Sequence, residues 1–179
     1  MPYLSDEERK GLLAIARRAA VSYVKDGKVP GEIPPAGKLA APGAAFVTLT
    51  SQGRLRGCIG YTEPISPLYK TVQECAIAAA TEDPRFRPVG PGEMDSLHIE
   101  ISVLTPLVPI RPGEVQVGLH GLMVRKGGRR GLLLPQVAVE QGWDRDAFLS
   151  AVCEKAGLPP DAWKAGADLY SFTAEVFGE

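Results

Sequence analysis

The chain has 179 residues, of which 20 are Lys or Arg and 21 are Asp or Glu, giving a net charge of −1 at pH 7. This balance disfavours a nucleic-acid-binding surface, which needs an excess of positive charge. Apolar residues make up 45% of the chain, which excludes an intrinsically disordered protein, and three cysteines are too few for a disulfide scaffold.

No apolar run reaches the roughly 18 residues that a membrane span needs. The first nine residues are polar and acidic, unlike a secretory signal. We therefore expect a cytoplasmic protein with reduced thiols and no membrane partner. The length fits one domain, or two small subdomains.

The first predicted element is a helix over residues 6–25. Ser5 and Glu8 form a capping box before it, apolar residues then recur at helical spacing, and Gly27 is typical of a C-terminal stop. Residues 27–43 contain four prolines and four glycines. This segment is predicted to be an extended Pro/Gly-rich arm, because proline does not fit a helix interior or a central strand.

Two strands joined by a turn at 51–53 are predicted over residues 45–61. The second strand contains the unusual segment LRGCIG at 55–60, in which glycines flank Cys58 and its neighbour. Glycine weakens a strand, so this segment indicates a bulge, or a close approach of a ligand or another backbone.

The later elements alternate between helices and groups of strands. In chain order they are a helix to about residue 81, a loop DPRFRP at 83–88, a half-buried strand at 97–103, a hairpin at 122–134, a helix capped by Asp144, and one closing strand over 170–176. Because strands arrive as hairpins, the order predicts an α+β fold with a mostly antiparallel sheet and flanking helices.

The LRGCIG segment, with FVTL at 46–49 before it, resembles the AMMECR-type domain family. Further blocks follow in the family's order: DPRF at 83–86, IEISVL at 99–104, GLHGL at 118–122, LLLPQVA at 132–138, and Trp143. The resemblance covers residues 5–177. It implies a larger and a smaller subdomain, intertwined within a single domain of residues 1–179.

The resemblance supplies no biochemical activity. Microbial members of the family are called protein A of the AmmeMemoRadiSam set, after their association with Memo-like and radical-SAM proteins. The resemblance therefore makes Memo-like and radical-SAM proteins candidate partners of this chain.

Cys58 is the candidate nucleophile. A cysteine reacts as its thiolate, which needs a positive neighbour or amide donors. Arg56 would share a face with Cys58 in a regular strand, and a bulge would change this. The alternative for Cys58 is a small buried thiol. Cys75 and Cys153 lie on apolar helix faces and are predicted to be packing residues.

His120 lies among glycines at the entrance to a strand. It is the candidate general base for Cys58, provided that the fold brings the two together. The alternative is a turn histidine that bonds to the backbone. The three cysteines lack a CxxC spacing, so no zinc site, other metal site or cofactor is expected.

Glu100 lies on the polar face of its strand together with His98, and two ligands do not make a metal site. Glu100 is instead a candidate ligand-binding residue, and a charge partner for Arg56 or Arg85.

Four arginines near Cys58 are candidates for an anion site, because each guanidinium offers a planar fork to carboxylate or phosphate. They are Arg54, Arg56, Arg85 and Arg87. A separate basic turn at 125–130 is predicted to be solvated, with nucleic-acid binding as its alternative.

Three functions remain open at this point. The first is an enzyme, or an enzyme partner, acting on a small anionic molecule. Its catalytic residues would be Cys58 as nucleophile or redox thiol and His120 as base; its ligand-binding residues would be Arg56, Asp83, Arg85, Glu100 and Gln136. The second is a non-enzymatic protein-interaction or regulatory module. The third is a role with nucleic acid, which the net charge disfavours.

Overall fold

The computed structural model describes residues 2–179. The chain forms two compact units: the first contains the residues before Thr105 together with Glu175–Glu179, and the second contains Thr105–Ala174. Each unit has one four-stranded antiparallel sheet with flanking helices. The predicted α+β fold, with a larger and a smaller subdomain, is confirmed.

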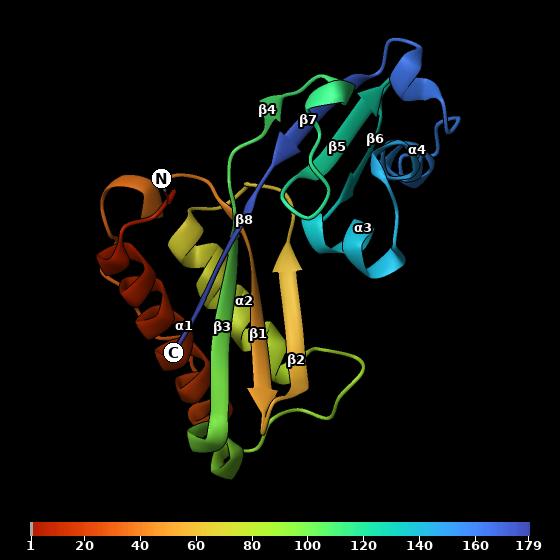
Figure 1. Cartoon of the computed structure of the whole chain (residues 1–179). Coiled ribbons are helices and arrows are strands. Elements are labelled where there is room, and N and C mark those ends of the chain that lie inside the picture. Colours follow the sequence, from red (N-terminus) through yellow and green to blue (C-terminus); the bar gives the residue numbers. More distant parts are fainter. Residues whose placement is uncertain (1) are drawn as a thin grey trace. The chain divides into compact units, whose positions relative to one another are not determined.

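The sheet of the first unit has the strand order β2-β1-β3-β8 (Figure 1). Its elements are α1 (Asp6–Asp26), β1 (Ala44–Ser51), β2 (Arg54–Tyr61), α2 (Leu68–Thr81), β3 (Leu97–Leu104) and β8 (Ala174–Gly178), with a short 3-10 helix η2 (Pro91–Ser96) before β3. The strands β1 and β2 form the predicted hairpin, and β2 is an edge strand.

Helix α1 forms where its local signals predict it. The Ser5 hydroxyl accepts a hydrogen bond from the amide of Glu8, the Glu8 carboxylate accepts one from the amide of Ser5, and Gly27 ends the helix in the left-handed region. Leu12, Ala16 and other small or apolar residues of α1 are buried in the core of the first unit.

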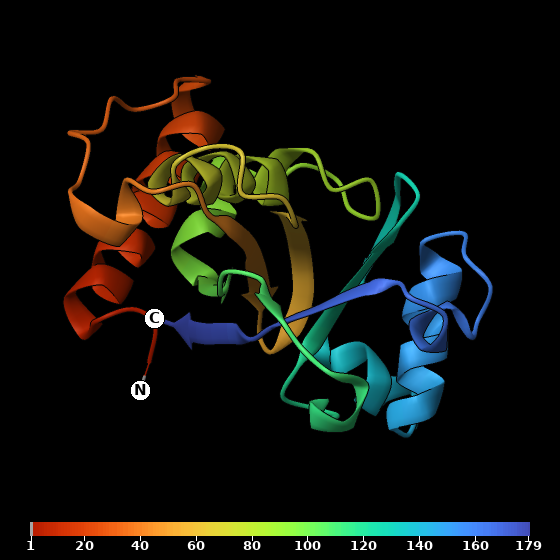
Figure 2. The ribbon, with the colours of Figure 1, turned by 90° about the horizontal axis from the view of Figure 1, so that it is seen from above.

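Alternation along β1 and β3 divides the first sheet into two different faces. Ala45, Val47 and Leu49 of β1 are fully buried, as are Ile99 and Ile101 of β3. These side chains face α1 and α2, which lie on one side of the sheet (Figure 2). Within the first unit, as far as residues 2–179 show, no α-helix covers the other side.

We call this other side the helix-free face. Residues directly opposite each other on antiparallel strands share a face, and the register places mostly polar side chains here. They are Phe46, Thr48 and Thr50 of β1, Cys58 of β2, and His98, Glu100 and Ser102 of β3. The helix-free face therefore contains two of the residues singled out from the sequence, Cys58 and Glu100.

The Pro/Gly-rich segment 27–43 contains no α-helix or extended strand, as predicted. It has one 3-10 turn, Gly37–Leu39, and an isolated bridge between Pro42 and Pro67. The side-chain amide of Gln73 donates a hydrogen bond to the carbonyl of Pro30 at 2.9 Å. This bond ties the first part of the segment to α2.

The sheet of the second unit has the order β4-β7-β5-β6. Its elements are β4 (Val108–Pro109), β5 (Gly121–Lys126), β6 (Arg129–Leu133), α3 (Pro135–Gln141), α4 (Arg145–Lys155) and β7 (Asp168–Phe172). The hairpin of β5 and β6 turns at Gly127 and Gly128, both at positive φ, as a tight turn requires. Asp144 caps α4 by accepting from the amide of Ala147.

The single closing strand predicted over residues 170–176 is wrong. The chain forms β7 in the sheet of the second unit and β8 in the sheet of the first, with Thr173 between them. The amide of Thr173 donates to the Thr105 hydroxyl, and the amide of Thr105 donates to the Thr173 carbonyl. Polar alternation continues across Thr173, so the pattern alone does not reveal the change of sheet.

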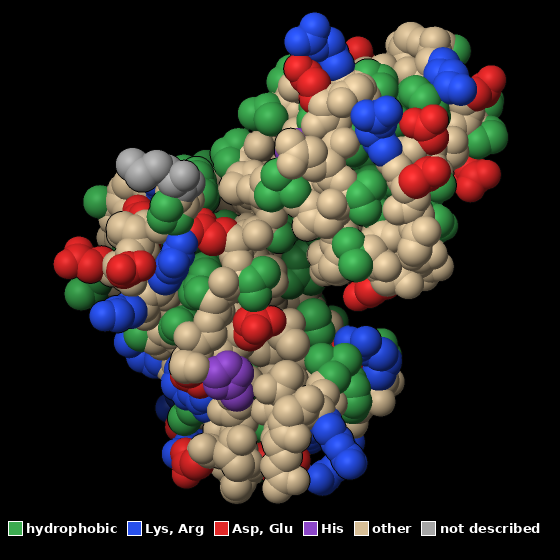
Figure 3. Space-filling model, viewed as in Figure 1, with side chains coloured by type: hydrophobic (Ala, Val, Ile, Leu, Met, Phe, Trp, Pro, Cys, Tyr) green, Lys and Arg blue, Asp and Glu red, His purple; other side chains and the backbone are tan. Residues whose placement is uncertain are grey.

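No helix formed by residues 2–179 is both long and apolar enough to cross a membrane. On the face of the molecule drawn in Figure 3, basic and acidic side chains are interspersed with uncharged surface. This distribution agrees with the near-zero net charge.

Candidate functional site

A bulge in β2 separates Arg56 from Cys58. Gly57 pairs with Leu49 of β1, whereas the next β1 residue, Thr50, pairs with Leu55, so Arg56 is the extra residue. A bulge reverses the alternation of side chains beyond it. Arg56 and Cys58 therefore do not share a face, as they would in a regular strand.

Cys58 is half-buried on the helix-free face, where its Sγ accepts a hydrogen bond from the Thr48 hydroxyl at 3.2 Å. Thr48 is paired with Cys58 on one side and with Glu100 on the other. Cys58, Thr48 and Glu100 therefore form a row across three strands. Thr48 was not predicted from the sequence, because the register that places it beside Cys58 depends on the bulge.

The Glu100 carboxylate is half-buried and has no hydrogen bond or ion pair with any of residues 2–179. The predicted pairing of Glu100 with Arg56 or Arg85 is wrong, since Arg56 pairs with Glu93 and Arg85 pairs with Asp83. Carboxylates that are removed from water are normally paired. Glu100 is thus a carboxylate next to Thr48 that has no polar partner among residues 2–179.

Asp83 and Arg85 hold the backbone of Cys58 at the free edge of β2. The amide of Cys58 donates to Asp83 Oδ2 at 2.9 Å, and Arg85 Nη2 donates to the Cys58 carbonyl at 3.4 Å. The Asp83 carboxylate, 3% exposed, also accepts from Arg85 Nη2 at 2.8 Å and from Arg85 Nε at 3.0 Å. The two side chains take the place of a neighbouring strand at this point of the edge.

The pKa of Asp83 lies well below its ordinary value. Its hydrogen bonds from the Arg85 guanidinium are the largest cause, and the Cys58 amide adds to them, whereas burial acts in the opposite direction. Asp83 is therefore ionised at neutral pH, and its charge is already neutralised by Arg85.

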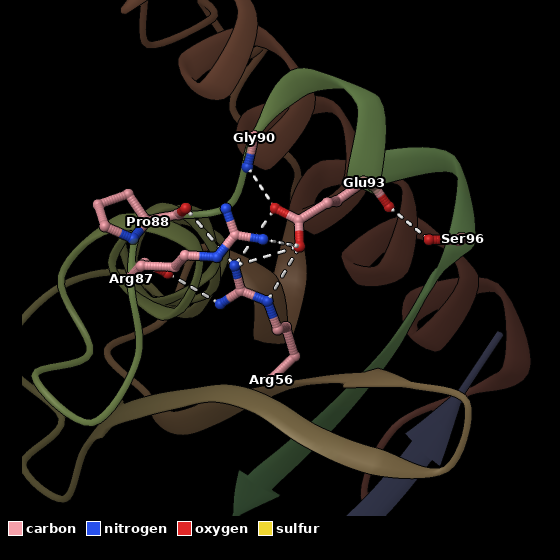
Figure 4. Close-up of polar contacts among 6 residues, drawn as sticks. All are labelled: Arg56, Arg87, Pro88, Gly90, Glu93 and Ser96. Carbon is pink, nitrogen blue, oxygen red and sulfur yellow. Dashed lines mark hydrogen bonds and ion pairs between the residues drawn. The ribbon is translucent and has the colours of Figure 1, made fainter.

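Arg56 fastens the loop after Asp83 to β2 (Figure 4). Its Nη1 donates to the Arg87 carbonyl at 2.9 Å, and its Nη2 lies 3.3 Å from Glu93 Oε2. The Glu93 carboxylate accepts in turn from the amide of Gly90 at 2.7 Å. This amide first, and the Arg56 guanidinium second, lower the pKa of Glu93. Arg56 is thus a structural tie rather than a free anion clamp.

The Arg56→Ala variant should lose about 1–2 kcal/mol of stability, because it removes a partly buried ion pair and a bond to a backbone carbonyl. Urea unfolding measures the loss, and amide hydrogen exchange should accelerate in residues 87–93. Arg54→Ala is the matched control, because Arg54 is exposed and makes no polar contact within residues 2–179. Equal effects of the two substitutions would contradict this role.

The glycines of LRGCIG serve close backbone packing. A Cβ at Gly57 would lie 2.0 Å from the carbonyl oxygen of Ala79 in α2, and one at Gly60 would lie 2.2 Å from the Phe46 ring. The segment therefore combines both features that its glycines predicted, a bulge and a close approach of another backbone.

His120 and Gln136 belong to the second unit. His120 Nδ1 accepts a hydrogen bond from the amide of Gln116 at 3.0 Å, which places the proton of the neutral ring on Nε2. This contact is the backbone bond considered as the alternative for this histidine. Gln136 is exposed at the start of α3. Because Cys58 lies in the first unit, its pairing with His120 stays a prediction.

The other two cysteines are buried, as predicted. Burial is the largest cause that raises the pKa of the Cys75 thiol, to about 12, and burial likewise raises that of Cys153. Both thiols therefore remain protonated and unreactive at neutral pH.

Three side chains of the basic turn at 125–130 donate hydrogen bonds to other residues of the second unit. Arg125 Nη2 donates to the Tyr170 hydroxyl at 2.9 Å, Lys126 Nζ donates to the Ala165 carbonyl at 2.6 Å, and Arg129 donates to the Gly157 carbonyl. Lys126 and Arg129 thus satisfy carbonyls in the segment that follows α4, and Arg125 bonds to a side chain of β7, which gives the turn a structural role.

Comparison with known proteins shows to which family the chain belongs. The AMMECR1 family model matches residues 13–177. The chain belongs to the AMMECR1 family. Protein MK0488 of Methanopyrus kandleri is 49% identical to this AMMECR1 chain over 187 residues, covering 98% of the chain and 90% of its own length. A protein of Thermococcus gammatolerans is 48% identical, with 98% and 92% covered.

A solved structure shares the AMMECR1 fold of this chain. The crystal structure of the uncharacterised protein PH0010 from Pyrococcus horikoshii matches with a TM-score of 0.76 and 46% identity. The match covers 98% of this chain and 93% of that one. The resemblance inferred from the sequence blocks is therefore confirmed, and it extends over both units.

Proposed function

We propose that this AMMECR1-family protein uses the Cys58 thiol on a small anionic molecule, either as an enzyme or as the thiol-bearing partner of one. The observation that carries the proposal is the row of Cys58, Thr48 and Glu100 on the helix-free face. It combines a half-buried thiol, a hydroxyl bonded to it, and a carboxylate without a partner among residues 2–179.

Each member of the row has a chemical role. A hydroxyl that donates to sulfur stabilises the thiolate, which is the reactive form. Glu100, in the same row but without a hydrogen bond to Thr48, is proposed as the group that accepts the thiol proton once a ligand is bound and returns it to a leaving group. Cys58 would then form a bond from sulfur to an electrophilic carbon of the ligand while that leaving group departs.

The exposed part of the Arg85 side chain is the reason to propose an anionic ligand. Its side chain is 55% exposed, and Nη1 makes no hydrogen bond within residues 2–179, while the rest of the guanidinium is held by Asp83 and by the Cys58 carbonyl. A fixed guanidinium with a free donor is suited to a carboxylate or phosphate. In this proposal Arg85 binds the anion, Gln136 and His120 stay candidate contributors from the second unit, and Memo-like or radical-SAM proteins stay candidate partners.

Thiol reactivity tests the proposal. Iodoacetamide at pH 7 should modify Cys58 in the folded protein and leave Cys75 and Cys153 unmodified, as read by peptide mass spectrometry. Thr48→Val should slow the modification of Cys58 about three- to tenfold, because it removes a hydrogen bond to the thiolate. Thr50→Val, a matched change on the same strand and face, should leave the rate unchanged.

The ligand is sought by comparing the wild type with two further variants. Small molecules that co-purify with the protein should be detected by mass spectrometry for the wild type and lost in Cys58→Ser or Glu100→Gln. A Cys58 that resists alkylation in the folded protein, or a rate unaffected by Thr48→Val, would rule out the activated thiol.

A further inference from the structure

An aromatic ring stands beside Cys58 on the helix-free face. Phe46 of β1 is paired with Gly60 of β2, two residues beyond Cys58. A Cβ at Gly60 would lie 2.2 Å from atoms of the Phe46 ring, so the ring lies over β2 in the space that a side chain of residue 60 would take. Two residues of a strand span roughly 6.6 Å. The ring is therefore the neighbour of the thiol along the edge strand, and the thiol chemistry described above does not use it.

An aliphatic side chain stands on the other side of Cys58. The bulge in β2 pairs Leu55 with Thr50, which places Leu55 on the helix-free face, at the next pair along from Cys58. Leu55 is 42% exposed, and both Phe46 and Cys58 are half-buried. Along β2 the thiol thus lies between an aromatic and an aliphatic side chain.

Positive and negative groups lie on opposite sides of the thiol. Arg85 reaches Cys58 from the free edge of β2, where its Nη2 donates to the Cys58 carbonyl at 3.4 Å and its Nη1 makes no hydrogen bond within residues 2–179. Glu100 lies on β3, two strands away in the other direction. Two strand spacings are roughly 10 Å. An anionic group at the edge therefore meets Arg85 and stays clear of the Glu100 carboxylate.

We propose that the ligand of Cys58 is an aromatic organic acid, with its electrophilic carbon at the sulfur, its ring against Phe46 and its acid group at Arg85. This inference rests on the proposed thiol function and names its class of substrate. Aromatic rings attract each other in offset or edge-to-face pairs, and a guanidinium nitrogen gives a carboxylate a charge-assisted hydrogen bond. Leu55 adds an apolar contact on the other side of the reacting carbon.

Four iodoacetamides separate the contribution of the ring from that of the charge, because all carry the same reactive carbon. They are 4-(iodoacetamido)benzoate with ring and acid, iodoacetanilide with the ring only, 3-(iodoacetamido)propanoate with the acid only, and iodoacetamide with neither. In each reaction the Cys58 sulfur forms a bond to the methylene carbon while the carbon–iodine bond breaks. Iodide departs, and the thiol proton passes to Glu100 or to the buffer.

Rates of Cys58 modification in the whole protein at pH 7 are read by peptide mass spectrometry. Each rate is divided by that of N-acetylcysteine amide with the same reagent, which removes differences in intrinsic reactivity. We expect the reagent with ring and acid to react at least tenfold faster than iodoacetamide on this scale. The reagents with one feature should each react several-fold faster than iodoacetamide.

Two variants assign these preferences to side chains. Phe46→Leu should reduce the preference for the ring several-fold and keep the preference for the acid, whereas Arg85→Gln should do the reverse. Each preference is a ratio of rates within one protein, so a change in stability or in the thiolate fraction cancels. Phe177→Leu is the matched control, because it shortens a partly buried ring of β8 that packs against the core. It should leave every ratio unchanged, and circular dichroism confirms that each variant is folded.

The outcomes separate this inference from the function on which it rests. A Cys58 that reacts with none of the four reagents in the folded protein refutes the thiol function and the aromatic acid together. A Cys58 that reacts without preference for the ring or without preference for the acid overturns the aromatic acid alone. The same holds if Phe46→Leu keeps the full preference for the ring.

Discussion

Replacing Gly57 with alanine is expected to lower the stability of the first unit by about 3 kcal/mol or more. The new Cβ would lie 2.0 Å from the carbonyl oxygen and 3.0 Å from the carbonyl carbon of Ala79. Both atoms belong to the backbone of α2, so no side-chain rotation relieves the overlap. The helix and the edge strand must move apart, which disrupts the packing around Val47 and Leu49.

Thermal unfolding followed by circular dichroism should show this as a fall in Tm of about 10 °C for a chain of this size. Gly92→Ala is the matched control, because a Cβ at Gly92 meets no atom within 4 Å and its φ is not positive. We expect that control to stay close to the wild type. A Gly57→Ala protein that melts within about 2 °C of the wild type would show that α2 and β2 separate easily.

Replacing Asp83 with alanine should cost about 2–3 kcal/mol, since it leaves the Cys58 amide and the Arg85 guanidinium without their shared acceptor. Asp83 accepts from the amides of both residues and from two nitrogens of the Arg85 side chain. The loss should also loosen Cys58, so alkylation of its thiol should change together with stability. Urea unfolding at pH 7 gives the first quantity, and peptide mass spectrometry gives the second.

The contribution of Asp83 has a defined dependence on pH. Its pKa in the folded protein is lower than the value of about 3.9 in an unfolded chain. The stabilisation is therefore fully present well above that value, and it is lost as the pH falls below about 4 toward the folded pKa. The difference in unfolding free energy between the wild type and Asp83→Asn should shrink between pH 5 and pH 2.

A matched test of this dependence uses Asp95, which is exposed and whose side chain makes no polar contact within residues 2–179. Asp95→Asn should follow the wild type at every pH. A gap between the wild type and Asp83→Asn that stays constant down to pH 2 would mean that Asp83 does not gain its stability from the ionised form.

Local signals in the sequence account for most of the elements. The capping box at Ser5, the turn at Gly127 and the cap at Asp144 each specify backbone geometry within a few residues, and each forms as predicted. The strand over 170–176 was mispredicted for a physical reason. Alternation reports that one face is buried, but not which sheet buries it, and the sheet changes at Thr173.

The site was predictable only in part. Glycine spacing drew attention to Cys58, but its hydroxyl partner Thr48 depends on a register shift in β2, next to the point where Gly57 packs against α2. Arg56 and Arg85 were recognised as candidate site residues, but their ion-pair partners were not predicted. Glu93 meets Arg56 only because the loop folds back onto β2, a contact between residues 37 positions apart.

Pairing of the arginines changes the chemistry expected of the site. A free cluster of guanidinium groups would bind anions by charge alone. Instead, Arg56 is neutralised by Glu93 and Arg85 by Asp83, so any selectivity for anions depends on the exposed edge of Arg85. The carboxylate of Glu100, which lies across Thr48 from Cys58, has no partner among residues 2–179.

The position of β8 in the chain has a consequence for biosynthesis. The residues Thr105–Ala174 form one uninterrupted unit, whereas the first unit needs β8, which the ribosome makes after them. Until residues 175–179 have been added, β3 has an unpaired edge, although the other elements of the first unit have already been made. Glu175 later ties the new strand to Arg9 and to the amide of Leu4. The unit begun first is thus completed by a strand made after the whole second unit, and until then its open strand edge is a target for chaperones or for misplaced strands.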